Sequence, residues 1–217
     1  MPLWRDLAST PLWETWALGL GLILGSFANV CIHRLPLGRS VVRPPSRCPA
    51  CGALIKPWDN VPVLSYVWLL GRCRSCRGRI SPRYPAVEGA NGLLYLALAW
   101  RAGPSLHTFV AMAFVTALLV LSLIDLDHGV LPNVITLPGI VLGLAASLLP
   151  GSHVTPLGAL GAAAGGYLAL WVVAKAYLKT RGVEGLGQGD WKMVAMLGAF
   201  LGWEGMLLTV FFASLSG

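Results

Sequence analysis

Long apolar runs that carry no Asp, Glu, Lys or Arg recur along this 217-residue chain, and they limit what it can fold into. Several of them approach the ~20 residues that an α-helix needs to cross a bilayer. Charged residues make up only 12% of the chain, about half of what a soluble domain carries. The runs are continuous, whereas strands of a membrane β-barrel alternate between polar and apolar residues. The sequence therefore predicts an all-α fold, a polytopic transmembrane helical bundle.

The runs also predict where the helices lie. We expect membrane-spanning helices over residues 15–32, 84–100, 106–124, 130–149 and 157–174. Two shorter apolar stretches, 191–203 and 205–217, are separated by Glu204, and the last is too short for a complete span. The chain is thus expected to end partway through a further span. Asp6 and Glu14 stand where a signal peptide would be basic, so the first run is predicted to stay as a helix. The small residues of 158–170 are expected to serve close helix packing.

Basic residues predict the orientation in the membrane. Residues 33–83 hold ten of the sixteen Lys and Arg, and Lys175, Lys179, Arg181 and Lys192 flank the loop predicted over 175–190. Because Lys and Arg mark cytoplasmic loops, both segments are predicted to face the cytoplasm and the N-terminus to lie outside. The sequence then divides into residues 1–32 (an N-terminal segment and first helix), 33–83 (a cytoplasmic loop) and 84–217 (a transmembrane core).

Four of the five cysteines form two pairs in the basic loop, Cys48-x2-Cys51 and Cys73-x2-Cys76. Four thiolates at this spacing suit a tetrahedral Zn²⁺ site, and they leave no open position for catalysis. We predict a structural, zinc-ribbon-like loop domain; the alternatives are redox thiols or two unrelated CxxC pairs. Cys31 lies within the first span and is expected to be a buried apolar residue. The surrounding basic charge favours contact with membrane lipid over nucleic acid.

Two acids are expected at the same face of the membrane. Asp125 closes the third span, and Asp190 follows Gly185, Gly187 and Gly189 in the segment GLGQGDWKM. Glycine permits close backbone approach, so this turn could bring Asp190 against a neighbouring helix. Paired carboxylates share a proton, and one can then act as an acid while the other acts as a base. The alternative is that these are solvated acids at helix ends, or that Asp190 favours a helix N-terminus. Asp127 and His128 are expected to be solvated turn residues.

Five motifs, in order, resemble those of the type IV prepilin peptidases, membrane aspartyl proteases with a GxGD signature. They are GSFANVCIHRLP (25–36), the paired CxxC motifs, ISPRYPAVEGANG (80–92), IDLDHGVLPNVITLP (124–138) and GLGQGDWKMVAMLGA (185–199). The resemblance implies that Asp125 and Asp190 are the catalytic pair, with Gly187 and Gly189 supporting the catalytic loop.

The resemblance also implies substrates, a cofactor and a location. The substrates are type IV prepilins and pseudopilins, whose basic leader is cut at the cytoplasmic face of the bacterial inner membrane. Many members of the family then methylate the new N-terminus with S-adenosylmethionine. The residues for that step are not identifiable from the sequence, and Glu88 is the one candidate outside the cysteine loop. Two alternatives are a proton-coupled transporter and a non-catalytic membrane scaffold that carries a zinc domain.

Overall fold

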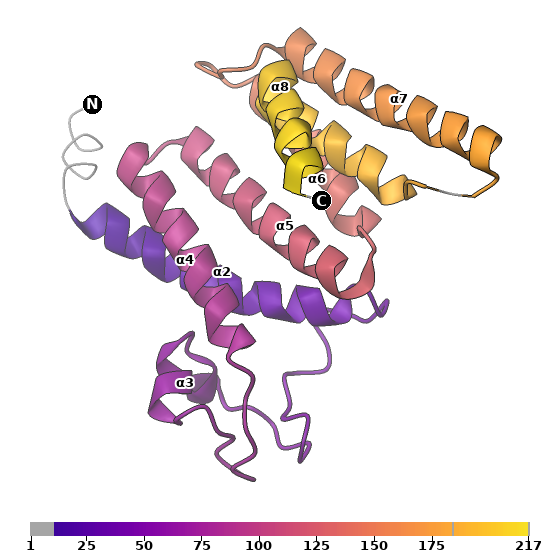
Figure 1. The fold of residues 1–217 in the computed structure, drawn as a ribbon. Coiled ribbons are helices and arrows are strands. Elements are labelled where there is room, and N and C mark those ends of the chain that lie inside the picture. The colour runs from indigo at the N-terminus through magenta and orange to yellow at the C-terminus, as the bar shows by residue number, and fades with distance from the viewer. Residues whose placement is uncertain (1–10, 184, 217) are drawn as a thin grey trace. The chain divides into compact units, whose positions relative to one another are not determined.

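A computed structural model describes residues 11–183 and 185–216 of the chain, so Asp6, used above to argue against a signal peptide, lies outside the described residues. Within these ranges the model is helical, and extended pairing is limited to two isolated bridges, Arg47 with Leu54 and Arg72 with Arg79. The predicted all-α fold is confirmed. The helices, shown in Figure 1, are α2 (Pro11–Arg34), the 3₁₀ helix η1 (Pro57–Asn60), α3 (Leu64–Trp68), α4 (Arg83–Arg101), α5 (Leu106–His128), α6 (Asn133–Ser147), α7 (Pro156–Arg181) and α8 (Gln188–Ser216).

Among the residues that the structure describes, four helices are long and apolar enough to cross a membrane, namely α2, α5, α7 and α8. Helix α4 has 19 residues and includes Arg83, Glu88 and Arg101. Helix α6 has only 15 residues, roughly 22 Å at 1.5 Å per residue, which is less than the ~30 Å of a hydrocarbon core. The chain forms two compact units, residues 1–124 and 125–217. The boundary between them falls inside α5.

In the first unit α4 packs antiparallel along α2. Small residues on α2 allow this close approach: a Cβ added to Gly21 would lie 2.8 Å from the Cα of Gly92, and one added to Gly25 would lie 2.8 Å from the Cα of Glu88. At the start of α4, the Asn29 side chain donates a hydrogen bond to the carbonyl of Tyr84 at 3.0 Å. Because α4 follows α2 along its length, the two helices form one closely packed antiparallel pair.

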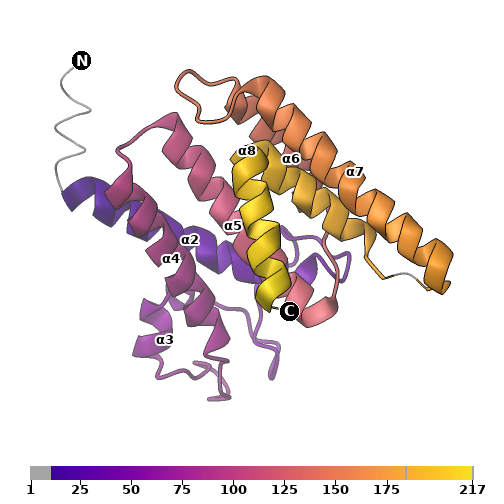
Figure 2. The ribbon, with the colours of Figure 1, turned by 45° about the horizontal axis from the view of Figure 1, so that its top comes forward.

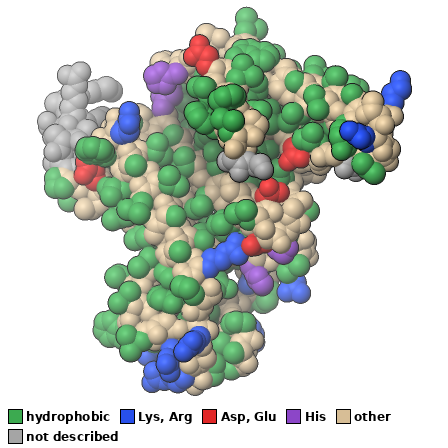
Figure 3. All heavy atoms as spheres, in the orientation of Figure 1, with side chains coloured by type: hydrophobic (Ala, Val, Ile, Leu, Met, Phe, Trp, Pro, Cys, Tyr) green, Lys and Arg blue, Asp and Glu red, His purple; other side chains and the backbone are tan. Residues whose placement is uncertain are grey.

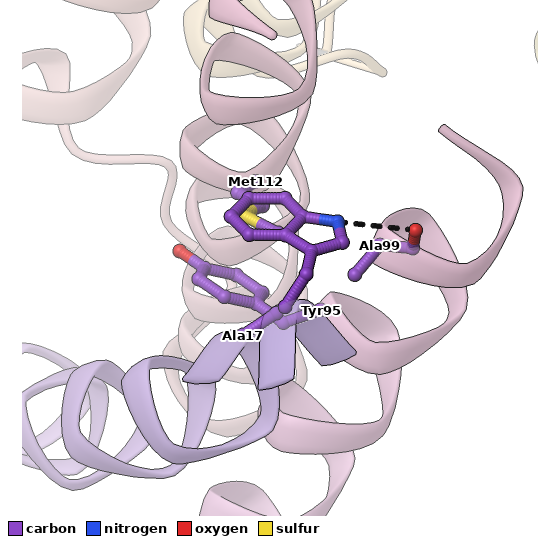
Figure 4. Close-up of a cluster of buried hydrophobic side chains, with 5 residues drawn as sticks. Ala17, Tyr95, Ala99 and Met112 are labelled. Atoms are coloured by element: carbon purple, nitrogen blue, oxygen red, sulfur yellow. Dashed lines mark hydrogen bonds between the residues drawn. The ribbon is translucent and has the colours of Figure 1, made fainter. Parts of the chain in front are cut away.

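The core of this unit joins α2, α4 and α5. Ala17, Tyr95, Ala99 and Met112 pack together, and the Trp13 indole donates to the carbonyl of Ala99 at 3.2 Å (Figure 4).

A chain of buried polar groups runs beside this cluster. Asn91 donates to the carbonyl of Gly21 at 2.7 Å and accepts from the Thr116 hydroxyl at 2.9 Å, and Thr116 also bonds the hydroxyl of Tyr95 at 2.9 Å. Side-chain hydrogen bonds of this kind link helices where water is absent, so they fix α2, α4 and α5 against one another.

The second unit contains α6, α7 and α8, and α7 and α8 lie side by side in both views (Figures 1 and 2). The predicted packing role of residues 158–170 is confirmed. Ala159, Ala162 and Ala163 are buried, and a Cβ added to Gly198 of α8 would lie 2.6 Å from the backbone of Ala162.

In the second unit, the end of α7 and the course of α8 differ from the sequence prediction. Helix α7 runs on to Arg181, where Gly182 ends it in a left-handed conformation (φ 72°). Lys175, Lys179 and Arg181 therefore belong to a helix and not to the predicted loop, because an aliphatic helical pattern tolerates basic residues in its last turns. Helix α8 is interrupted at Gly202, whose φ of 67° and ψ of −168° are not helical. The interruption falls next to the predicted break at Glu204.

Candidate active site and cysteine centre

Asp190 lies in the first turn of α8, where its side chain caps the helix. Its Oδ2 atom accepts a hydrogen bond from the backbone N–H of Gly187 at 3.0 Å. Gly187 directly precedes α8, so this contact is the acidic half of a capping box, in which a residue in the first turn reaches back to the helix start. The side chain is half-buried. Capping fixes the position of one carboxylate oxygen and leaves the other, Oδ1, for a further partner.

Asp125 lies in the last turns of α5 and is exposed. Its carboxylate is near enough to Asp190 for the two charges to interact. The structure thus brings together the two acids that the sequence singles out, from segments 65 positions apart. Asp127 and His128 are also exposed, but they belong to the end of α5, which continues one turn beyond the predicted limit at Ile124. Asp127 has a further interaction of its own.

Contacts from the α5–α6 turn hold the start of α8 in place. A Cβ added to Gly189 would lie 2.7 Å from the Cβ of Leu131, so only glycine fits there without a shift. Lys192 Nζ donates to Asn133 Oδ1 at 2.8 Å. Sequence reasoning did not assign these two polar residues to the site. The available signal was that Lys192 stands two residues after Asp190 and that Asn133 directly follows Pro132.

The cysteine loop brings its four thiols together. The Sγ atoms of Cys48, Cys51, Cys73 and Cys76 all lie within 4.8 Å of one another, and the cluster could hold a metal ion. The Sγ atoms of Cys48 and Cys76 are 3.8 Å apart, which is far beyond a disulfide bond. A tetrahedral ion with metal–sulfur bonds of about 2.3 Å needs sulfurs about 3.8 Å apart, so the donor set and its spacing fit such an ion. Cys31 lies outside this cluster.

The two CxxC segments have the same backbone hydrogen bonds, offset by 25 residues. Cys48 N–H donates to Ala53 and Cys73 N–H donates to Gly78, each at 2.9 Å. The residue after each pair is left-handed, Gly52 at φ 70° and Arg77 at φ 58°. The two halves are therefore equivalent knuckles, although the second uses arginine where a left-handed backbone favours glycine.

The thiols of the cluster have different acidities. Hydrogen bonds from the backbone N–H groups of Cys76 and Ser75 lower the pKa of Cys73 to about 6. At Cys51 a backbone hydrogen bond from Ala53 acts in the same direction, but the neighbouring thiols outweigh it and raise the pKa to about 11. Four adjacent thiolates repel one another unless a cation neutralises them.

Two acids tie the loop together. Asp59 accepts a bidentate hydrogen bond from Arg74, with distances of 2.6 to 3.0 Å, and so joins the segment between the knuckles to the second knuckle. Glu88 of α4 is buried, and its Oε2 accepts from the backbone N–H of Val63 at 2.8 Å. Its carboxylate also bonds the Ser26 side chain. Glu88 thus has two internal partners that connect the loop to α2 and α4.

These features define a class: a multi-pass membrane protein with a pair of carboxylates in its second unit and a four-cysteine centre in its first. Comparison with known proteins is consistent with that class. Residues 20–102 match the bacterial peptidase A24 N-terminal domain, and residues 112–217 match the type IV leader peptidase family.

Similar curated proteins cover nearly the whole chain. A prepilin leader peptidase/N-methyltransferase of Pseudomonas putida is 42% identical over 240 residues, which is 100% of this chain and 83% of the relative. The protein of the same name in Pseudomonas aeruginosa is 41% identical over 241 residues, with the same shares. One from Myxococcus xanthus is 42% identical over 207 residues, which is 95% of this chain and 62% of the relative. No solved structure matches the chain.

The chain belongs to the type IV leader peptidase family. The resemblance inferred from its motifs is confirmed, and so is its classification as an enzyme of the peptidase class. With four helices that qualify as spans, it is a multi-pass protein of the inner membrane.

Proposed function

We propose that the chain is an aspartyl endopeptidase in which Asp125 and Asp190 are the catalytic pair. The observation that carries this proposal is the electrostatic interaction between two carboxylates from separate segments. A scaffold has no need to bring these acids together. A proton-coupled transporter needs acids along a path through the bilayer, whereas both of these lie at helix ends.

The chemistry follows from having one protonated and one ionised carboxyl group. The ionised carboxylate takes a proton from water as the water oxygen bonds to the carbon of the scissile peptide, and the protonated acid donates to the carbonyl oxygen. The tetrahedral intermediate then breaks its C–N bond: the departing amine takes a proton from the acid that first received one, and a hydroxyl group of the intermediate returns its proton to the other carboxylate. Gly187 supports this arrangement by donating its backbone N–H to Asp190, and Gly189 by fitting against Leu131.

We propose that the substrates are type IV prepilins and pseudopilins, which lose a basic leader at the cytoplasmic face, with the N-terminus of the chain outside. The names of the relatives support prepilin substrates, and the concentration of Lys and Arg in residues 33–83 supports the orientation. Those names also support N-methylation of the product with S-adenosylmethionine. Glu88 is a weak candidate for binding this cofactor, because Val63 and Ser26 already engage its carboxylate.

We further propose that the cysteine centre holds a structural Zn²⁺ through Cys48, Cys51, Cys73 and Cys76. Four thiolate ligands complete a tetrahedron, so the metal would order the loop and take no part in cleavage. Metal analysis of the purified protein should find zinc, and Cys48→Ser should remove it. Cys31→Ser, which changes a cysteine outside the cluster, is the control and should keep it. A parent protein without zinc would refute this assignment.

The catalytic assignment is tested by incubating the purified protein with a prepilin and measuring the product masses. Asp125→Asn should abolish cleavage, because the amide neither accepts nor donates the required proton. Asp127→Asn is the matched control, since it changes an acid two residues away on the same helix end. Cleavage retained in Asp125→Asn, or lost equally in both variants, would contradict the assignment. Adding S-adenosylmethionine should raise the mass of the mature product by one methyl group.

A further inference from the structure

Helix α3 turns an apolar face away from the rest of the first unit. The exposed fractions are 68% for Leu64, 84% for Trp68 and 83% for Leu70. With Val61 and Val67, which are also exposed, they form what we call the α3 patch. Within α3, Leu64 is three positions before Val67 and four before Trp68, the spacing of one helix face. The opposite side of α3 faces inward, where the hydroxyl of Tyr66 donates to the carbonyl of Ile80 at 3.4 Å.

The backbone at both ends of α3 is held in a costly conformation. Val63, just before the helix, has φ 59°, and Leu70, two residues after it, has φ 52°. Residues with a Cβ rarely adopt such angles, least of all β-branched ones. Strain of this kind persists only where surrounding contacts impose it. At Val63 the contact is the hydrogen bond to Glu88. The α3 patch is therefore set in place by the fold.

The same hydrogen bond fixes the level of α3 relative to the membrane. Glu88 lies five residues into α4 from Arg83, or roughly 7.5 Å along the helix axis. Because α3 starts at the residue after Val63, it lies beside the first turns of α4, the helix that packs along the candidate span α2. We expect that level to correspond to the boundary between lipid headgroups and acyl chains, where interfacial helices bury their apolar faces.

Charge around the α3 patch matches an anionic membrane. Residues 33–83 carry ten Lys and Arg, and their one acid, Asp59, is paired with Arg74. Figure 3 shows hydrophobic side chains covering the region of α3, with Lys and Arg beside them. Trp58 in η1 is exposed as well, and Lys56 lies 5.4 Å from its ring centre. Tryptophan, with its apolar ring and polar N–H, is enriched at this boundary, and basic side chains bind the headgroups of acidic lipids.

We propose that the α3 patch inserts into the interface of the protein's own membrane, with acidic phospholipids held by the basic residues around it. The cysteine loop is then a membrane-seated domain that is anchored at three places: the end of α2, the start of α4 and the α3 patch. The proposal does not depend on peptidase activity. It requires only that the chain spans a membrane and that the loop has the fold described.

Site-specific photocrosslinking of the full chain tests this proposal. The protein is reconstituted into vesicles of phosphatidylcholine, with or without phosphatidylglycerol, and carries p-benzoylphenylalanine in place of Leu64 or Trp68. The matched control has the same group in place of Val42, which is 79% exposed in the same loop but outside the α3 patch. All three side chains are exposed, so their replacement leaves packing intact. Irradiation is followed by mass spectrometry of the adducts.

The expected result is that phospholipid adducts form at positions 64 and 68 and are absent at position 42. The yield at 64 and 68 should fall when phosphatidylglycerol is omitted or salt is raised, since salt screens the attraction between basic residues and headgroups. Three outcomes would overturn the proposal: equal lipid labelling at position 42, no lipid adduct at 64 and 68, or crosslinks from these positions to a second copy of the chain. Labelling of an added prepilin in preference to lipid would identify the α3 patch as a substrate-docking face and would overturn it too.

Discussion

Replacing Asp190 separates its two suggested roles, capping α8 and catalysis. In Asp190→Asn the amide oxygen can still accept the hydrogen bond from Gly187, which spans 3.0 Å in the structure. In Asp190→Ala that acceptor is lost. Neither variant has a carboxyl group that can exchange a proton. The two variants therefore lack the same catalytic group and differ only in whether the capping hydrogen bond can form.

The magnitudes follow from these contacts. Both variants lose the favourable interaction of a negative charge with the helix N-terminus, worth about 0.3–1 kcal/mol. Only Asp190→Ala also loses the cap, worth about 1 kcal/mol. For a chain of this length 1 kcal/mol corresponds to a melting-temperature shift of about 2–4 °C. Loss of a general acid or base lowers the cleavage rate by roughly 10² to 10⁴-fold.

The assay combines melting in detergent with single-turnover cleavage of a prepilin. We expect both variants to lose cleavage to a similar extent and Asp190→Ala to melt about 2–4 °C below Asp190→Asn. If Asp190→Asn cleaves at the parent rate, Asp190 acts only as a cap and the catalytic assignment is refuted. If the two variants melt at the same temperature, the capping contact contributes nothing to stability.

Three further predictions concern packing and the cysteine loop. Gly21→Leu should lower the free energy of unfolding by about 1–3 kcal/mol, because the α4 backbone lies 2.8 Å from a Cβ added at this position. Gly19→Leu is the control, since a Cβ added there has no atom within 4 Å, and it should leave the melting temperature unchanged. Arg77→Gly should stabilise the loop by about 1 kcal/mol, because the left-handed backbone at this position (φ 58°) is strained for a residue with a Cβ. Release of zinc to a chelator should then be slower, and an unchanged rate would contradict the backbone strain at Arg77. Hydrogen bonds from Arg74 lower the pKa of Asp59 from 3.8, so this pair stabilises the loop at neutral pH and stops doing so as the pH falls through the lowered pKa. The difference in melting temperature between the parent and Asp59→Asn should vanish in acid. A difference that stays constant with pH would refute a stabilising role for the ionised pair.

Much of this fold could be predicted because a bilayer leaves few choices. A charge-free run of about 20 residues must form a helix, since no water satisfies its backbone groups. That constraint predicted α2, α5 and α7. It says little about helix ends outside the apolar core, so the continuation of α5 to His128 and of α7 to Arg181 was missed. Residues there can be helical or extended, because water satisfies either.

The site could be predicted in part. The spacing of the cysteines indicated that their thiols would meet, and the glycines before Asp190 indicated a close approach to another helix. The partners of single polar residues could not be found, because they depend on how segments far apart in the chain pack. Lys192 with Asn133, 59 positions away, is one example. Glu88 with Val63 is another: a lone acid in an apolar run suggests function, and only the fold shows its backbone partner.

The repeated knuckle has a consequence for how the loop responds to metal supply. Each knuckle forms its own hydrogen bonds, and 21 residues separate Cys51 from Cys73. Closing a chain of that length costs about 3 kcal/mol of entropy. Zinc shared between the halves would act as a removable crosslink, so scarcity of metal would open the loop while leaving the membrane helices folded.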